Sequence, residues 1–547
     1  MPGSLYNVSH AHVVIAENSP VVAANLKVLL RELGFSDRLV VVVKDYKLLL
    51  AEFRKRPVDL FVCDYQFGKG INGGHILEDL RLRKLLPKAC AVMMLTNDID
   101  GDILRVFHDT QVDDYLTKPY SLYGMKRKVR RLCYAKLLVS QLHSIDESLG
   151  SEHISQMFAK FHEEHPKLRV ESDKLEGLVY LSMGDEKRAF THFTNCAKQY
   201  KATWAWLGVA DCLIKLGYFE RAEQYLQAWA EKTDAAKTRI LDRLAHLHLL
   251  RDNYQGAVQD LSHAEQLAPG SQRRLFAMSL INEAFEQPER ALSDFHQFAK
   301  HAVRVRFDRL NLHIQIMRLK LKVLTRTDSD KLASISRNAG LLSRKISQQS
   351  QRLPLALVSA HIALIQDDHK TASLYLDSLM QNHTQLASHY LYYLLYLLSL
   401  ANLHEGFKQI MAYRDELEIS YVSPIVEQSE RVRLRFLSNV EVDKRETLHK
   451  TLAVIQKSKT DNMDKAHTEA IKLVNTRPHC GPSALALLEL FNHQLPEHLS
   501  RYEIKRLVIH CEEAVRFSIS LDEGDKYSAR SYVRGAKKHF NSLLKTV

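Results

Sequence analysis

The stretch Leu60-Phe-Val-Cys-Asp-Tyr-Gln-Phe67 decides the fold, because a short apolar run ends there on a single carboxylate, Asp64. Such a run is typical of a strand buried on both faces of a parallel sheet. In open α/β sheets, ligands bind outside the carboxyl ends of the strands. Asp64 is therefore the candidate reactive residue, although Asp at a strand end also serves as a helix cap or turn former.

Three other apolar runs also end on polar residues: Val13 to Ala16 before Glu17 and Asn18, Ala91 to Leu95 before Thr96, and Asp114 to Thr117 before Lys118 and Pro119. One further apolar run covers residues 39–43. Helical patterns lie between the runs, at residues 21–33, 46–56, 74–86 and 103–109. Strands that alternate with helices in this way predict an α/β fold with a doubly wound, five-stranded parallel sheet.

The polar residues at the strand ends suit phosphoryl transfer to a carboxylate. An ionised Asp64 would be the nucleophile, Lys118 would pair with the phosphoryl oxygens, and Thr96 would donate a hydrogen bond to them. A hard divalent cation such as Mg²⁺ prefers oxygen ligands and keeps some of its waters. The predicted metal ligands are Glu17, Asn18, Asp64 and the carbonyl of Gln66.

Residues 11 to about 135 resemble the CheY-like receiver domain of two-component response regulators. The resemblance implies a flavodoxin-like fold and phosphorylation of Asp64 by a histidine kinase or a phosphotransfer protein. It also implies Mg²⁺ as cofactor, a cis peptide at Lys118-Pro119 and a switch aromatic at Tyr115. By the same resemblance the chain is a phosphoacceptor and not an enzyme, apart from phosphotransfer and dephosphorylation at its own receiver.

One residue departs from the family pattern. Receiver domains usually carry two acids after the first strand, and here the pair is Glu17 and Asn18. An amide oxygen can still bind the metal, but it removes one negative charge and should lower metal affinity. The alternative is a degenerate receiver that serves only as a docking surface.

Composition bounds the remaining possibilities. The chain has 547 residues, more than one hydrophobic core normally holds, so at least two domains are expected. We expect a cytoplasmic protein, because no apolar run approaches the roughly 18 to 20 residues of a spanning helix and the first residues do not resemble a signal peptide. Seven cysteines without a Cys-x-x-Cys pair predict reduced thiols and no structural zinc.

Positive charge exceeds negative charge along the chain. Its 76 Lys and Arg residues against 64 Asp and Glu residues give a net charge of +12. Such an excess can attract nucleic acid or an acidic partner, or it can cover an ordinary solvated surface. Residues 125–149 are basic with a helical period, and we interpret them as the last receiver helix running into a connector.

A period of about 34 residues begins after residue 151. Small residues followed four positions later by a large apolar one recur at spacings of 33, 35 and 34, in the pairs Ala189/Phe193, Ala222/Leu226, Ala257/Leu261 and Ala291/Phe295. Small residues let two helices approach closely where they cross. This pattern resembles tetratricopeptide (TPR) repeats, which build an all-α superhelical solenoid.

The predicted domains follow from these patterns. They are a receiver at 1–135, a helical connector at 136–155, regular TPR repeats at 156–300, an irregular basic helical segment at 301–350, and divergent TPR-like repeats with a C-terminal cap at 351–547. The phase returns in the last part at the pairs Ala372/Leu376 and Gly406/Ile410, and more weakly at Ala466. We expect residues 524–528 to break the C-terminal helices.

Histidine pairs invite a metal interpretation. The two densest sequences are His162-Glu-Glu-His165 and His246-Leu-His248. Neither has the His-Glu-x-x-His order of a zinc hydrolase, so we interpret them as surface or inter-helix histidines.

Together the patterns predict a bacterial-type response regulator in which a receiver controls a TPR scaffold. The scaffold groove would bind a partner protein. The layout resembles regulators of the VieB type, which implies contact with a companion kinase or regulator. Two alternatives stay open, a nucleic-acid-binding regulator that uses the basic helices and a constitutive adaptor with a degenerate receiver. Whether the chain forms a homodimer also stays open.

Overall fold

The computed structural model describes residues 8–67, 71–97, 100–140, 150–234, 236–304, 309–346, 349–419 and 423–542. The chain divides into two compact units. The first comprises residues 1–281, 294–307 and 421–430, and the second comprises residues 282–293, 308–420 and 431–547. Each unit is described by itself.

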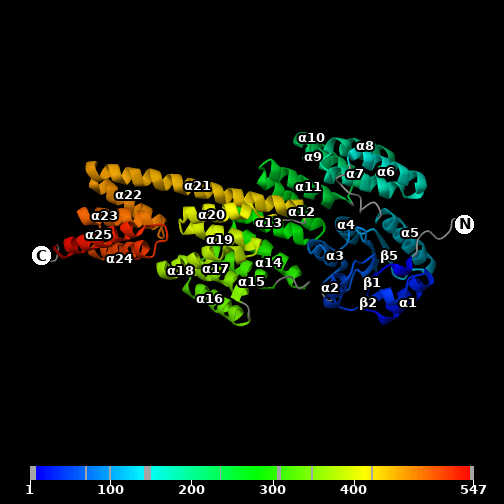
Figure 1. Ribbon diagram of the computed structural model, residues 1–547, viewed down its shortest axis with the longest axis horizontal. Helices are drawn as coiled ribbons and strands as arrows, with labels where there is room; N and C mark the ends of the chain where they lie inside the picture. The colour runs from blue at the N-terminus through cyan, green and yellow to red at the C-terminus, as the bar shows by residue number, and fades with distance from the viewer. Residues whose placement is uncertain are drawn as a thin grey trace. The chain divides into compact units, whose positions relative to one another are not determined.

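A parallel five-stranded sheet opens the first unit (Figure 1). Its strands are β1 (Val13–Ala16), β2 (Val40–Val43), β3 (Leu60–Asp64), β4 (Ala91–Thr96) and β5 (Asp114–Thr117). They lie in the order β2-β1-β3-β4-β5, and every neighbouring pair is parallel. This is the doubly wound sheet that the alternating apolar runs predict, and Asp64 is the last residue of the central strand.

Helices cover both faces of this sheet. They are α1 (Pro20–Glu32), α2 (Tyr46–Lys55), α3 (Gly73–Leu82), α4 (Gly101–Asp109) and α5 (Leu122–Ser140). Alternate residues of a strand point to opposite faces. Val13 and Ile15 therefore pack with residues of α1 and α5, while Val14 and Ala16 pack with residues of α2, α3 and α4. The resulting two-sided core holds the strand ends, and the polar groups on them, in fixed positions.

Helical hairpins complete most of the first unit. They are built from α6 (Ser151–Glu164), α7 (Arg169–Ser182), α8 (Glu186–Tyr200), α9 (Thr203–Lys215), α10 (Phe219–Ala230), α11 (Lys237–Leu250), α12 (Tyr254–Leu267), α13 (Gln272–Ala284) and α14 (Pro288–Arg304). The eight residues of the 34-residue pattern lie on α8, α10, α12 and α14, and all are buried.

Short 3-10 helices occur at Val8–His10, Asp37–Leu39, Pro166–Leu168 and His383–Gln385.

The need for small residues is visible around Phe193. A Cβ at Gly177 on α7, or at Gly208 on α9, would lie 2.5 Å from the Phe193 ring. The ring on α8 thus fills the space that two glycines leave on neighbouring helices. The turns before α8 and α10 contain Gly184 and Gly217, both with φ near +78°, a backbone conformation that glycine adopts without strain.

The remaining helices are α15 (Arg309–Lys322), α16 (Ser329–Arg344), α17 (Gln349–Ile365), α18 (His369–Gln381), α19 (Ser388–Leu400), α20 (His404–Asp415), α21 (Pro424–Asp461), α22 (Met463–Thr476), α23 (Gly481–His493), α24 (Arg501–Arg516) and α25 (Glu523–Ser542). The part of the chain after the sheet is therefore all-helical wherever it is described. The helices of this part do not all form regular hairpin pairs, because α21 is a single helix of 38 residues.

The predicted helix break at residues 524–528 is wrong. Helix α24 ends at Arg516 and α25 begins at Glu523, so these residues form the first turns of α25. The Asp522 side chain accepts the amide of Asp525 at 2.8 Å, which satisfies a free donor at the helix start. Part of the connector predicted at 136–155 lies outside the described residues, with α5 ending at Ser140 and α6 beginning at Ser151.

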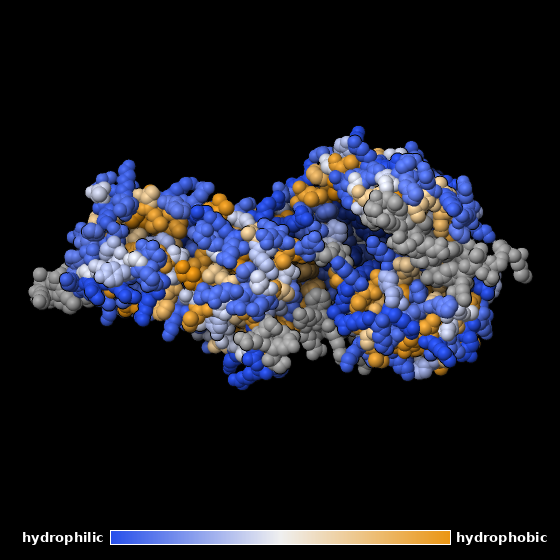
Figure 2. All heavy atoms as spheres, viewed as in Figure 1, coloured by the Kyte–Doolittle hydropathy of each residue, from blue (hydrophilic) through white to orange (hydrophobic). Residues whose placement is uncertain are grey.

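All seven cysteines are buried free thiols, as their scattered positions predict. Hydrophilic residues dominate the face shown in Figure 2, where hydrophobic side chains form small scattered groups. None of the helices in the described part of the chain combines the length and the apolar composition that crossing a membrane demands.

Candidate functional site

The carboxyl edge of the sheet gathers three of the predicted site residues. The Lys118 ammonium donates to Glu17 Oε2 at 2.8 Å and to Asp64 Oδ2 at 2.9 Å. Glu17 is buried, and the side chains of Asp64 and Lys118 are only 14% and 18% exposed. Three charges from β1, β3 and the end of β5 thus meet in one partly buried cluster.

Backbone amides fix the other oxygen of each carboxylate. Glu17 Oε1 accepts the amide of Ser19 at 2.9 Å, and Asp64 Oδ1 accepts the amide of Gln66 at 3.1 Å. The Lys118-Pro119 peptide is cis, as the family resemblance implies. Burial lowers the pKa of Lys118, but its bonds to Glu17 and Asp64 outweigh burial and raise the pKa above the ordinary value. Lys118 is therefore a fixed cation beside Asp64.

Asn18 is close to the same edge but points its amide nitrogen elsewhere. Its Nδ2 donates to the carbonyl of Phe67. Two carboxylates, Glu17 and Asp64, therefore converge here instead of three. Their oxygens are hard donors of the type that Mg²⁺ prefers, so the donor set fits this ion with one negative charge fewer than an all-acid site.

Thr96 and Tyr115 lie on neighbouring strands. Thr96 ends β4 and is 1% exposed, and its carbonyl accepts the amide of Lys118 at 2.7 Å. The Tyr115 ring lies 5.5 Å from Phe107 of α4, centroid to centroid, and Phe107 lies 5.5 Å from the ring of Tyr65. Tyr65 directly follows Asp64, so three rings connect the acceptor to α4.

A second set of charges joins this α/β domain to the helical hairpins. Glu78, a buried residue of α3, accepts the hydroxyl of Ser271 at 2.9 Å and the amides of Gln272 and Arg273 at 2.8 and 3.1 Å. These groups form the N-terminus of α13. A carboxylate at that position satisfies free amides and interacts favourably with the helix dipole.

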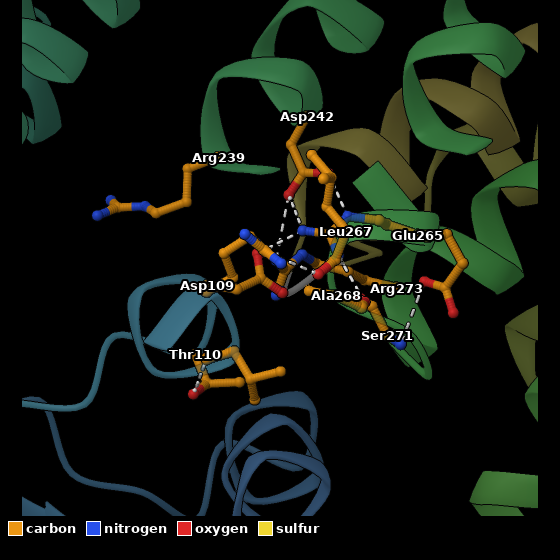
Figure 3. Close-up of polar contacts among 12 residues, drawn as sticks. Asp109, Thr110, Arg239, Asp242, Glu265, Leu267, Ala268, Ser271 and Arg273 are labelled. Atoms are coloured by element: carbon orange, nitrogen blue, oxygen red, sulfur yellow. Dashed lines mark hydrogen bonds and ion pairs between the residues drawn. The ribbon is translucent and has the colours of Figure 1, made fainter. Parts of the chain in front are cut away.

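Asp109 of α4 and Asp242 of α11 hold the two arginines that follow (Figure 3). Asp109 Oδ1 accepts from Arg273 at 2.6 Å and also from Arg274. Asp242 accepts from Arg274 Nε at 2.6 Å and from Arg273 at 3.1 Å. Burial raises the pKa of Asp242, but the two guanidiniums outweigh it and lower the pKa to about 2. Arg274 is fully buried, so this network is an internal part of the first unit.

Two further contacts extend the network. Arg105 of α4 donates to Asp234 at 2.9 Å and to the carbonyl of Leu267 at 3.3 Å. Beside them, α3 and α4 enclose a cavity of about 540 Å³ against α7, α9, α11 and α13. Charged side chains line much of the cavity, among them Arg81, Asp109, Asp211, Lys215, Arg239 and Arg243.

Sequence reasoning missed this network, because the residues of α3 and α4 lie 129 to 195 positions before their partners on the helical hairpins. Two local signals were available. Glu78 and Asp79 interrupt the apolar face of α3, where charges are expected only if they are paired. Arg273 and Arg274 stand in the first turn of α13, where cations oppose the helix dipole. Each signal predicts a partner without naming it.

Comparison with known families identifies the first domain. The model of the response regulator receiver domain matches residues 13–130, which contain the whole sheet and about the first half of α5. A search of curated proteins found no match to the chain. Residues 13–130 therefore form a receiver domain, which supports a two-component response regulator, and an all-helical region follows it.

Proposed function

We propose that the chain is a response regulator whose receiver domain accepts a phosphoryl group on Asp64. A histidine kinase or a phosphotransfer protein supplies the group. The N–P bond of its phosphohistidine breaks, and an O–P bond to the Asp64 carboxylate forms. Lys118, which already contacts Asp64 at 2.9 Å, would bind the new phosphoryl oxygens. Thr96 at the end of the next strand would donate its hydroxyl to them.

Receiver domains generally bind Mg²⁺ for phosphorylation. Glu17, Asp64 and the Gln66 carbonyl would hold the ion here, with Asn18 as a weak fourth ligand. Bound Mg²⁺ neutralises charge on the transferring phosphoryl group. The Asn18→Asp variant restores the missing carboxylate, so we expect it to bind Mg²⁺ more tightly, by roughly tenfold or more. Tyr and Trp fluorescence during Mg²⁺ titration measures this, and equal affinities in the two proteins would show that Asn18 is not a ligand.

The helical region would act as a TPR scaffold for a partner protein. The first helices of successive hairpins, α7, α9, α11 and α13, would form its binding groove. In the first unit these four helices face α3 and α4 across the charged cavity. The receiver thus covers the surface on which a partner would bind.

The observation that carries this proposal is the contact of Glu78 and Asp109 with the start of α13. Asp109 lies half a turn after Phe107 on α4, and Phe107 contacts both Tyr65 and Tyr115. A phosphoryl group on Asp64 would draw Thr96 inward, and Tyr115 would follow. Phe107 and α4 must then repack, which removes Asp109 from its arginines. Phosphorylation would therefore uncover the groove by shifting a two-state equilibrium.

Beryllofluoride with Mg²⁺, which mimics an acyl phosphate, tests this mechanism. Hydrogen exchange should become faster at the amides of Gln272 and Arg273, which donate to Glu78. The Asp64→Asn variant is the control and should show no change. If hydrogen exchange in the natural protein stays unchanged with Mg²⁺ in large excess, the switch mechanism is refuted. The remaining interpretation is then a constitutive adaptor with a degenerate receiver.

The nucleic-acid alternative finds less support. Its basic helix α5 already directs Lys128 and Arg131 at Asp114, at 2.7 and 2.6 Å, and Lys136 at Asp113, at 3.0 Å. These cations stabilise the receiver's own edge strand. Binding of DNA or RNA with an affinity that falls steeply as salt rises would nevertheless favour this alternative.

A further inference from the structure

We propose that His162, Asp173 and Glu176 form a zinc site between α6 and α7, with His192 of α8 as its fourth ligand. This inference does not depend on the proposed signalling function. One ligand atom from each of the first three residues lies within 4.8 Å of the other two. The His162 side chain is 15% exposed, and the other two are 8% and 10% exposed.

The His162 ring points a nitrogen into this cluster without a hydrogen bond. Its Nε2 is buried and lies 3.2 Å from Asp173 Oδ1, yet the geometry forms no hydrogen bond among the described residues. In tetrahedral zinc sites, bonds of about 2.0 to 2.2 Å to nitrogen and oxygen place neighbouring ligand atoms roughly 3.3 to 3.5 Å apart. The 3.2 Å separation therefore suits two ligands of one ion.

The tautomer of His192 supports the same conclusion. Its Nε2 lies 2.6 Å from the backbone carbonyl of Asp173, which can only accept, so Nε2 carries the proton. A neutral ring then has a lone pair on Nδ1, and Nδ1 lies 3.8 Å from Glu176 Oε2. In the neutral ring this nitrogen and the carboxylate oxygen are both acceptors, and a cation between them would bind to both. A metal-bound His commonly donates its other nitrogen to a backbone carbonyl in this way.

Tyrosine hydroxyls hold the outer carboxylate oxygens. Tyr180 donates to Glu176 Oε1 at 2.7 Å, and Tyr200 donates to Asp173 Oδ2. These bonds leave Asp173 Oδ1 and Glu176 Oε2 directed at the two imidazoles. Hydrogen-bonded carboxylates of this kind are typical of the groups that surround a metal.

Two other groups touch the cluster. Arg169 Nε lies 3.9 Å from Asp173 Oδ2, but its side chain is 59% exposed. Cys196 Sγ lies 3.5 Å from the protonated nitrogen of His192. This sulfur neighbours the nitrogen that donates to the Asp173 carbonyl and not the nitrogen that faces Glu176, so it is not counted among the ligands. The ligand set is therefore two imidazoles and two carboxylates, which suits Zn²⁺ among the divalent metals.

The rival interpretation is a protonated His162 that pairs with Asp173 and Glu176 without any metal. A measurement of metal binding distinguishes these two interpretations. The full chain, stripped with a chelator, is titrated with Zn²⁺ and, for visible spectra, with Co²⁺. We expect one tightly bound equivalent and the intense absorption of tetrahedral Co²⁺. The His162→Gln and Glu176→Gln variants should each weaken this binding at least 100-fold.

Two further variants complete the test. His153→Gln changes an exposed histidine on the same helix α6 and should bind like the natural chain. Tyr200→Phe removes one supporting hydroxyl and should weaken affinity about tenfold. The inference is overturned if the natural chain binds no stoichiometric metal, or if Glu176→Gln, folded by circular dichroism, binds as tightly as His153→Gln.

Discussion

The Asp109→Asn substitution tests whether buried charges dock the receiver on the helical hairpins. Asp109 is 5% exposed and lies at the end of α4, where one oxygen accepts from both Arg273 and Arg274. An asparagine has the same shape and can still accept through its amide oxygen. The substitution therefore removes charge from the contact and leaves packing almost unchanged.

The magnitude follows from two hydrogen bonds. A bond to a charged group contributes about 1.5 to 3 kcal/mol, and a neutral one about 0.5 to 1.5 kcal/mol. Because the arginine donors stay charged, the two bonds together should lose at most about 2 to 3 kcal/mol. The loss stays below the roughly 3 to 5 kcal/mol of a broken buried ion pair, because Glu78 and Asp242 still balance the two arginines. Removing a negative charge from the C-terminus of α4 favours that helix by itself. A net loss must therefore come from docking.

Hydrogen exchange at the start of α13 measures this loss. A change of 2 kcal/mol corresponds to about 30-fold faster opening, and 3 kcal/mol to about 150-fold. The control is Asp102→Asn on the same helix, whose side chain is 75% exposed and pairs with Arg105, an exposed pair worth at most about 1 kcal/mol. Equal protection in Asp109→Asn and the natural chain, or equal losses in the two variants, would refute the docking argument.

Three further predictions concern stability. Gly208→Ala should destabilise the first unit by about 1 to 3 kcal/mol in urea unfolding, because its Cβ would meet the Phe193 ring at 2.5 Å. Gly340→Ala in α16, with open space around it, should instead stabilise by up to about 1 kcal/mol, and a loss there would contradict the packing argument. Burial and two neighbouring imidazoles lower the pKa of His369 to about 3 in the folded chain, against about 6.5 in the unfolded chain. Between these two pKa values the unfolded state binds more protons than the folded state, so stability falls as pH falls. His369→Asn should reduce this acid loss between pH 6.5 and 4, whereas a variant of the exposed His498 should retain it.

Local patterns were sufficient to predict the receiver. Its strands begin and end within a residue of the apolar runs, because period and turn chemistry are properties of neighbouring residues. The same holds for the first four repeat pairs, whose small and large residues are all buried on α8, α10, α12 and α14. Helix α21 was not predicted, since a 34-residue pattern of paired helices does not indicate where a single helix of 38 residues begins or ends.

The meeting of three charged residues at the receiver edge was predicted from the sequence, but contacts between distant segments were not. Glu17, Asp64 and Lys118 meet because parallel strands end at the same edge of a sheet, a rule that needs no coordinates. Glu78 and Arg273 meet only because a hairpin 195 positions later lies on α3. No pattern of spacing encodes that distance, and the histidine pair at His162 likewise gave no sign of Asp173 on another helix.

The use of charge at the contact suits a switch better than apolar packing would. Burying an ion pair gives little net stability, because desolvation offsets most of the attraction, yet the remainder depends steeply on geometry. An apolar contact weakens gradually as surfaces slide. Asp109 accepts both arginines through a single oxygen, so a small displacement of α4 weakens two charged bonds together. In the proposed mechanism the docked state would therefore be only slightly favoured over an open one, and a few kcal/mol from phosphorylated Asp64, relayed through Phe107, would reverse the balance.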